Sequence, residues 1–381
     1  MTSRRRRVGI VGAGQLARMM AQAAIPLDIE LVLLAERADD GAAQVVSQVI
    51  VGSPDDPARL RELADRVDVV TFDHELVDPD LLAQLEREGV QVWPSAATMA
   101  LAQNKRRQRA ELSAAGFPAP RFRDVDSFED IRAFGEEHGW PIVLKASRGG
   151  YDGRGVWIAQ DAGAAQIIWN QAQEHGTILL AEEWLTLERE FAVLVARRPS
   201  GEIVVYPAIE TVQRDGMCNE LHVPMTSDCG LATQAEAMAL QIAEHIQSVG
   251  ILAVEFFVSN HSLLVNELAP RPHNSGHWSI EGAQTSQFEQ HLRAVLDLPL
   301  GATGVMGKAV ATVNIIGPPD GSDPRGRLAD TMQVSGAHIH FYGKSARAGR
   351  KLGHVTVVGD DASEVLARAN HAVHLLDGSA T

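Results

Sequence analysis

Two glutamates stand inside apolar segments, where a charged side chain needs a specific partner. Glu255 lies in AVEFFV and Glu267 in LLVNELAPR, and the short segment SNHS separates the two stretches. If both are strands joined by a tight turn, the carboxylates lie side by side on one face, with Asn266 adjacent. Paired carboxylates repel unless a proton or cation lies between them, and such oxygens suit Mg²⁺ bridging nucleotide phosphates. The alternative is that one glutamate faces solvent on an edge strand.

A lysine and a glycine-rich loop indicate a polyphosphate ligand. Lys145 ends the apolar stretch PIVLK, and a buried ammonium is costly unless it meets an anion. The loop SRGGYDGRGVW, residues 147–157, follows between two expected strands. Glycine lets backbone N–H groups approach a polyphosphate closely, although the segment is not a Walker A sequence. A plain β-turn with exposed charges is the alternative.

A second glycine loop opens the ordered part of the chain. Gly12, Gly14 and Ala17 in VGIVGAGQLARMM fit the G-x-G-x-x-G/A pattern, and Glu36 ends the next apolar run, where a ribose-binding acid belongs. Backbone N–H groups at the start of a helix favour any anion. The loop therefore fits either a nicotinamide dinucleotide or another phosphate-bearing ligand.

The pattern of apolar runs divides the chain into three regions. Strand-like runs at 8–13, 30–36, 68–73 and 90–94 alternate with helical segments, which predicts a doubly wound parallel sheet over about the first hundred residues. A smaller α/β unit follows, and a third region starts near residue 188 and turns to short strands after Pro299. The domains expected are 1–104, 105–187 and 188–381, the last with a small β-rich end from about residue 300.

Composition narrows the range of ligands and locations. The chain has 381 residues and a formal net charge of −15, which argues against general nucleic-acid binding, because phosphate backbones need a basic face. No uninterrupted apolar run reaches the ~20 residues of a membrane span, and the N-terminal arginines precede no signal-peptide core. We therefore expect a cytoplasmic protein that acts on small molecules.

Several of these segments together resemble a known family. Lys145, GGYDGRG, EEWL at 182–185, Glu190, Glu255 and the Asn266–Glu267 pair resemble an ATP-grasp enzyme. The segments NELAPRPHNSGHW, GRKLGH, GQLARMM, SQFEQHLRAVLDLPL and VNIIG are similar to the N5-carboxyaminoimidazole ribonucleotide synthetases of purine biosynthesis, and the likeness runs from about residue 8 to 358. It implies an α/β ATP-grasp fold with an N-terminal doubly wound parallel-sheet domain, a small α/β lid domain and a C-terminal α+β domain.

The resemblance also implies a reaction, in which ATP, bicarbonate and 5-aminoimidazole ribonucleotide give ADP, phosphate and the N5-carbamate through carboxyphosphate. ATP and Mg²⁺, with Mn²⁺ as an alternative, are the cofactors, and a homodimer is the family expectation. The residues it assigns to the nucleotide are Lys105, Lys145, Gly150, Tyr151, Asp152, Gly153, Arg154, Gly155, Glu182, Glu183, Trp184, Leu185, Glu190, Gln213, Asn266 and Glu267. In this assignment, 150–156 form the lid loop over the ATP phosphates, 182–185 are the adenine hinge and Glu190 is the ribose ligand.

The remaining roles concern the second substrate and the chemistry. The residues implied to bind the ribonucleotide are Gly14, Gln15, Leu16, Glu75, Tyr151, Arg154, His273, Arg350 and Lys351. Those implied in catalysis are Arg271, Asp152, His273 and Asn274, with Glu255 and Glu267 as metal ligands. On this interpretation the opening glycine loop receives the ribonucleotide and no nicotinamide is involved.

Several of these residues also fit purely structural roles. Lys105 in NKRRQR fits a solvated helix face, Arg271 a structural ion pair, and Arg350 with Lys351 a solvated basic turn. His273 and His277 have a zinc-like spacing, but HNSGH lacks the central Glu of H-E-x-x-H, so His277 fits a structural histidine instead.

Two positions depart from the family, and three other functions compete. Gln213 stands where the family usually has His, and Leu76 where it more often has Asn. The competing functions are another ATP-grasp ligase such as formate-dependent glycinamide ribonucleotide transformylase, a nicotinamide oxidoreductase, and a non-catalytic nucleotide-binding protein. The segments GRKLGH and HNSGHW argue against the first of these.

Overall fold

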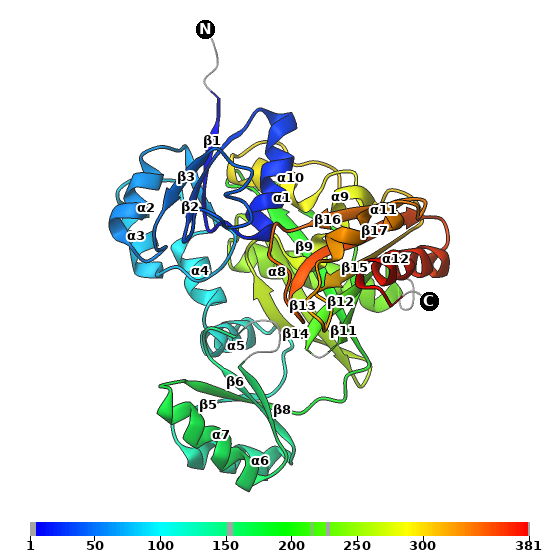
Figure 1. Ribbon diagram of the computed structural model, residues 1–381. Coiled ribbons are helices and arrows are strands. Elements are labelled where there is room, and N and C mark those ends of the chain that lie inside the picture. Colours follow the sequence, from blue (N-terminus) through cyan, green and yellow to red (C-terminus); the bar gives the residue numbers. More distant parts are fainter. Residues whose placement is uncertain (1–4, 151–154, 215, 226–228, 380–381) are drawn as a thin grey trace.

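Three sheets organise the chain in the computed structural model, which describes residues 5–150, 155–214, 216–225 and 229–379. Figure 1 shows an N-terminal lobe, a small lobe that projects away from the rest, and a large C-terminal body. Helix α5 (Lys105–Ala114) lies between the first two lobes. Asn104 caps this helix by accepting from the Arg107 N–H.

The N-terminal lobe contains a parallel four-stranded sheet in the order β3-β2-β1-β4, so the expected doubly wound sheet is confirmed. Its strands are β1 (Arg7–Val11), β2 (Glu30–Ala35), β3 (Gln48–Val51) and β4 (Val69–Phe72). Its helices are α1 (Gln15–Ala24), η1 (Ile25–Leu27), α2 (Pro57–Ala64), α3 (Pro79–Arg87) and α4 (Ala96–Ala102). The strand expected at 90–94 shrinks to one parallel bridge between Val92 and Val70, because Pro94 has no N–H to continue the ladder.

The small lobe is an antiparallel sheet with two helices packed against it. The strands, in the order β5-β8-β6-β7, are β5 (Phe122–Val125), β6 (Ile142–Ala146), β7 (Val156–Ala159) and β8 (Leu179–Glu183). Helices α6 (Phe128–His138) and α7 (Ala162–Glu174) bury Ile131, Phe134, Ala165 and Ala172 against the sheet. The segment 151–154, on which part of the expected lid loop falls, lies outside the described residues.

The C-terminal body is built on one large antiparallel sheet, ordered β14-β13-β9-β11-β12-β15-β17-β16, with β10 paired to β9. The strands are β9 (Arg189–Arg197), β10 (Ile203–Val205), β11 (Ile209–Arg214), β12 (Met217–Val223), β13 (Gly250–Ser259), β14 (Ser262–Ala269), β15 (Ala309–Ile316), β16 (Ala337–Phe341) and β17 (Lys351–Gly359). The helices are α8 (Cys229–His245), η2 (Asn274–Gly276), α9 (Ser279–Gly282), α10 (Gln287–Val295), η3 (Pro324–Arg327), α11 (Leu328–Thr331) and α12 (Ala362–Asp377).

The short strands expected after Pro299 are present as β15, β16 and β17, but they do not form a separate unit. Strand β15 pairs with β12, so the large sheet continues through the strands after Pro299. Helix α12 then buries Val365, Ala369, Ala372 and Leu376. These residues recur at intervals of three and four, which is the spacing of one helix face.

Helix α10 joins the N-terminal lobe to the C-terminal body. Its residues Phe288, Leu292 and Val295 belong to the same apolar core as Leu16 and Met20 of α1. In Figure 1, α1 and α10 lie where the two lobes meet. This packing brings the glycine loop before α1 to the side of the body that carries the segment after β14.

Candidate active site

The glycine loop before α1 is closed by a carboxylate of the protein itself. The Gly14 N–H donates to Asp73 Oδ2 at 2.5 Å, and Asp73 is buried immediately after β4. A Cβ at Gly12 would lie 1.8 Å from Asp73 Oδ1, so glycine is required there. The carboxylate thus takes the anion position that a dinucleotide pyrophosphate needs in a nicotinamide enzyme. Sequence reasoning missed Asp73, whose only signal is its place at the end of a buried strand.

The other residues of this loop divide between the core and the inter-lobe surface. Leu16 was expected to contact the ribonucleotide, but its side chain is buried in the core, which leaves only its main chain for a ligand. Gln15 Oε1 accepts a hydrogen bond from Lys344 Nζ at 2.6 Å. Lys344, which sequence reasoning missed, thereby ties the loop to the segment that carries Arg350 and Lys351. Arg350 donates to the Ser345 hydroxyl at 3.0 Å.

The hairpin β13–β14 brings the two glutamates together as expected. Asn260 and His261 adopt positive φ values of 49° and 56°, which suit the tight turn between the strands. Glu255 is the direct cross-strand partner of Glu267, so both side chains lie on one face of the sheet. Asn266 Nδ2 donates to Glu255 Oε2 at 3.3 Å.

The two carboxylates differ in their counter-charges. Lys105 Nζ lies 2.8 Å from Glu267 Oε1, so Lys105 faces the site rather than only solvent. Burial favours the neutral form of Glu267, but Lys105 outweighs it and the pKa is lowered. Burial, together with the negative charges of Glu267 and Glu190, raises the pKa of Glu255 to about 7. An excess of negative charge therefore remains at Glu255.

This donor set fits a magnesium ion. Two carboxylates on one face, one of them without a full counter-charge, are the usual protein contribution to Mg²⁺, which takes its other ligands from phosphates and water. Within the described parts of the chain, no group of three or more His, Cys, Asp and Glu side chains is arranged to hold a metal. The arrangement therefore favours a metal shared with a nucleotide over a closed structural site.

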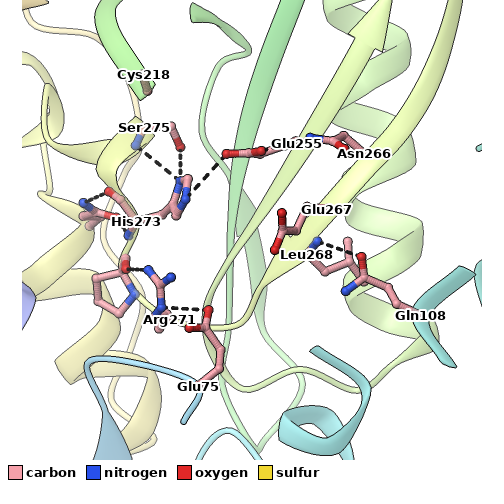
Figure 2. A network of polar contacts seen from close by, with 12 residues as sticks. Glu75, Gln108, Cys218, Glu255, Asn266, Glu267, Leu268, Arg271, His273 and Ser275 are labelled. Atoms are coloured by element: carbon pink, nitrogen blue, oxygen red, sulfur yellow. Dashed lines mark hydrogen bonds and ion pairs between the residues drawn. The ribbon is translucent and has the colours of Figure 1, made fainter. Parts of the chain in front are cut away.

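Figure 2 shows that the segment after β14 brings His273 against Glu255 and Arg271 against Glu75. Arg271 Nε lies 2.8 Å from Glu75 Oε1, so its ion pair reaches the N-terminal lobe rather than the metal-type carboxylates. His273 Nδ1 accepts from the Ser275 N–H, which leaves the ring proton on Nε2, 3.6 Å from Glu255 Oε1. Burial, aided by Arg271, lowers the pKa of His273 to about 3, so the ring is neutral at pH 7.

Two neighbours complete this segment. The Asn274 side chain lies beside the Cys218 thiol. His277 is fully buried and its ring stacks on His354 with 5.0 Å between centroids. Its surroundings are those of a structural histidine.

Lys145 meets an anion of the protein. Its Nζ lies 2.6 Å from Glu182 Oε2, and Arg109 Nε lies 2.7 Å from the other oxygen of the same carboxylate. Burial opposes the charge on Glu182, but Lys145 and Arg109 outweigh it and hold the pKa at about 2. Lys145 Nζ also reaches Asn266 Oδ1 at 3.4 Å. The side chain of Glu182 is thus committed to this cluster, so only its main chain is available as part of a hinge, and Arg109 is a residue that sequence reasoning missed.

The expected hinge and ribose residues lie nearby. Trp184 is exposed, while Glu183 Oε1 accepts from the Arg121 N–H at 2.8 Å. Glu190 on β9 receives a hydrogen bond from the side chain of Gln213 on β11. Burial nevertheless raises the pKa of Glu190. Of the expected lid loop, residues 150–156, the structure describes Gly150 and Gly155, and Tyr151, Asp152, Gly153 and Arg154 lie outside the described residues.

Comparison with known proteins agrees with this arrangement. Residues 110–288 match the ATP-grasp domain, residues 5–103 the ribonucleotide synthetase preATP-grasp domain, and residues 310–368 the phosphoribosylaminoimidazole carboxylase C-terminal domain. These matches define the chain as an ATP-grasp enzyme, a ligase.

Relatives with known names narrow the family further. N5-carboxyaminoimidazole ribonucleotide synthase of Mycobacterium tuberculosis is 46% identical over 97% of this chain and 87% of that protein. The solved synthetase of Thermus thermophilus is 36% identical with a TM-score of 0.87, covering 97% of this chain and 98% of that one. The Aspergillus clavatus enzyme, solved with ADP and 5-aminoimidazole ribonucleotide, is 30% identical with a TM-score of 0.88, covering 98% and 99%.

The chain belongs to the N5-carboxyaminoimidazole ribonucleotide synthase family, and the resemblance read from the sequence is confirmed. Among the described residues, no helix combines the length and apolar character needed to cross a membrane.

Proposed function

We propose that this chain converts 5-aminoimidazole ribonucleotide, bicarbonate and ATP to N5-carboxyaminoimidazole ribonucleotide, ADP and phosphate. The observation that carries the proposal is the meeting of Glu255 and Glu267 with the Arg271–His273 segment on one side of the β13–β14 hairpin. Phosphoryl transfer needs oxygen ligands for a metal ion and a cationic group near the transferred phosphoryl group. Glu255 and Glu267 offer the oxygen ligands, and Arg271 offers the cation.

The nucleotide is held between the small lobe and the large sheet. Lys105 and Lys145 face its phosphates, the main chain of 182–185 pairs with adenine, and Glu190 with Gln213 binds the ribose. Glu255 and Glu267, with Asn266 adjacent, would hold Mg²⁺, or Mn²⁺ as the alternative. When bound, the ion neutralises the charge on the phosphate oxygens as the γ-phosphoryl group moves.

Bicarbonate is placed by Arg271, His273 and Asn274. The Arg271 guanidinium offers a bidentate fork to a carboxylate-like anion, and its charge favours attack by a bicarbonate oxygen on the γ-phosphorus. That attack forms carboxyphosphate and releases ADP. Since His273 is neutral, its Nε2–H donates a hydrogen bond to the anion and does not act as a general acid at pH 7.

The ribonucleotide is placed on the side of the N-terminal lobe. The main chain of Gly14–Leu16, with Gln15 and Glu75, faces the nucleoside, and Arg350 and Lys351 bind its 5′-phosphate together with Lys344. Lys344 joins this set because it already contacts Gln15 at 2.6 Å. The amine attacks the carbon of carboxyphosphate, or CO₂ released from it, and phosphate leaves. Asp152, Tyr151 and Arg154 of the lid loop are assigned to the same substrate.

Three further expectations accompany the proposal. The domains are 1–104, 105–187 and 188–381, the protein is cytoplasmic, and it forms a homodimer. Gel filtration with light scattering measures the last of these directly.

The decisive experiment measures ADP release from Mg-ATP with and without bicarbonate and 5-aminoimidazole ribonucleotide. ADP release that requires the ribonucleotide and yields the carbamate supports the proposal. ADP release that is stimulated by bicarbonate alone would support ATP-grasp chemistry but would mean that the acceptor of the carboxyl group is a different molecule. Absence of ADP in every combination contradicts the proposal.

A further inference from the structure

Gln287 is a fully buried polar side chain placed at the joint between the lobes. It is the first residue of α10, and its own N–H donates to Ser279 Oγ at 2.9 Å. Its side chain leaves the helix toward the segment after β14. Gln287 Oε1 accepts from the His273 N–H at 2.8 Å, and Gln287 Nε2 donates to the His273 carbonyl at 2.7 Å. Both main-chain groups of a proposed site residue are thus bound by one amide.

The same amide reaches one more residue of the segment. Gln287 Nε2 lies 3.3 Å from His277 Nδ1, where a neutral histidine can accept. A Cβ at Gly276 would lie 2.4 Å from Gln287 Oε1, so the glycine lets η2 pack directly on the amide. Only a primary amide supplies one acceptor and two donors in this plane.

The segment has little regular secondary structure to fix its conformation. Helix η2 has three residues, and the stretch from Arg271 to His277 is otherwise irregular. Short irregular segments hold their side chains less precisely than regular elements, so the orientation of such a site depends on supporting hydrogen bonds. The His273 ring takes its direction from the main chain that Gln287 binds.

We propose that Gln287 is a positioning residue, which aims His273 and Asn274 at bicarbonate by binding the main chain of His273. It does not touch a substrate. The proposal rests on the proposed function, because bicarbonate binding by this segment is part of it.

The chain contains a matched control in the same helix. Gln290 is also fully buried, and its amide binds both main-chain groups of Gly301, donating to the carbonyl at 2.7 Å and accepting from the N–H at 2.8 Å. Gly301 lies in the loop between α10 and β15, outside the set of proposed site residues. Gln287 and Gln290 therefore differ mainly in the main chain that their amides bind, which is His273 for Gln287 and Gly301 for Gln290.

The experiment compares Gln287→Met with Gln290→Met in the full chain. Each substitution removes one amide and leaves a main-chain N–H unpaired, while the His273 carbonyl keeps the Gly276 N–H at 3.0 Å. Gln287→Met should therefore lower the melting temperature no more than Gln290→Met does. Gln287→Met alone should raise the KM for bicarbonate at least tenfold, with the KM for ATP within twofold of wild type. Equal kinetic effects of the two variants, or a parallel rise in the KM for ATP, would overturn the proposal.

A second readout is independent of activity. Hydrogen–deuterium exchange should show the His273 amide protected in wild type and in Gln290→Met, and exposed in Gln287→Met. Retained protection in Gln287→Met overturns the proposal. If Gln287→Met does not fold, Gly276→Ala displaces the same amide and should give the same selective rise in the KM for bicarbonate. A wild-type enzyme without bicarbonate-dependent ADP release contradicts the proposed function, whereas the exchange result still decides whether Gln287 fixes the segment.

Discussion

Two charge clusters lie on either side of Asn266, one buried and one partly exposed, and they differ in how completely their charges are paired. The closed cluster is Arg109, Lys145 and Glu182, with both oxygens of the carboxylate 2.6–2.7 Å from cations. The open cluster is Glu255, Glu267 and His273, in which the contact of Glu255 with a ring nitrogen is 3.6 Å and the ring is neutral.

The contrast appears in the acidity of the two carboxyl groups, of which Glu182 is buried and Glu255 is partly exposed. The pKa of Glu182 is lowered to about 2, whereas that of Glu255 is raised to about 7. Burial opposes ionisation in both, so the difference comes from the neighbouring charges, which are cations beside Glu182 and the carboxylates of Glu267 and Glu190 beside Glu255. Burial of a carboxylate therefore does not mark a ligand site, but burial without a counter-charge does.

Breaking the closed cluster should have the largest effect on stability. Arg109→Met removes one cation from Glu182 and leaves the Val265 carbonyl without the donor 3.2 Å away. Loss of one partner from a buried ion pair typically costs about 3–5 kcal/mol. We expect a clear fall in the urea midpoint. Arg106→Met is the control, because its partners Asp124 and Asp126 are largely exposed and such pairs contribute about 1 kcal/mol or less. Equal shifts of the urea midpoint in the two variants would mean that the closed cluster contributes no more to stability than an exposed ion pair.

Changing the open cluster should affect turnover more than stability. Glu267→Gln keeps the shape of the side chain but removes the negative charge that pairs with Lys105. We expect turnover at saturating Mg²⁺ to fall by on the order of 10²-fold, a typical effect of losing a charge-stabilising group at a reacting centre.

The melting temperature of Glu267→Gln should remain close to wild type, because the Glu267 side chain is partly exposed. Glu202→Gln is the control, because it alters a carboxylate next to Arg198, beyond the end of β9, whereas Glu255 pairs with Ala192 five residues before that end. Near-wild-type turnover by Glu267→Gln would remove Glu267 from the metal-type site.

The open cluster should also give a pH dependence near neutral pH, where the closed cluster gives none. The folded-state pKa of Glu255 is above its ordinary value of 4.5, so its protonated form contributes stability at low pH that is lost as pH rises from 4.5 through about 7. Glu255→Gln never ionises. In EDTA, its stability relative to wild type should therefore increase between pH 5 and pH 8, by about 1–2 kcal/mol.

Thermal melts of wild type and Glu255→Gln at the two pH values provide the measurement. The carboxyl group of Glu182 behaves in the opposite sense, since its stabilisation is present above 4.5 and is lost as pH falls through about 2. If the difference in stability between wild type and Glu255→Gln does not change with pH, the assignment of an uncompensated charge to Glu255 is wrong.

The open cluster could be predicted from the sequence and the closed one could not. Glu255 and Glu267 are brought together by a local hairpin, whose turn and apolar alternation are visible in a dozen residues. Arg109 pairs with Glu182 across 73 positions, and Asp73 with Gly14 across 59. Such long-range partners depend on how lobes pack, which residue spacing does not encode. Helix α12 is a different case. Its apolar residues recur at helical spacing within a short stretch of sequence, so this helix was predictable although it was not among the expected elements.

The smallest expected effect concerns Gln213, where the chain departs from its family. The Gln213 amide donates to Glu190, a carboxylate whose pKa burial raises, as it does at Glu255. Gln213→His keeps a donor near Glu190, so only the strength of one hydrogen bond changes, which is worth about 0.5–1.5 kcal/mol. ADP affinity measured by calorimetry should therefore shift by less than about tenfold. A larger gain in ADP affinity would mean that Glu190 needs a cationic partner. The ribose end of the site would then carry an uncompensated negative charge, as the open cluster does.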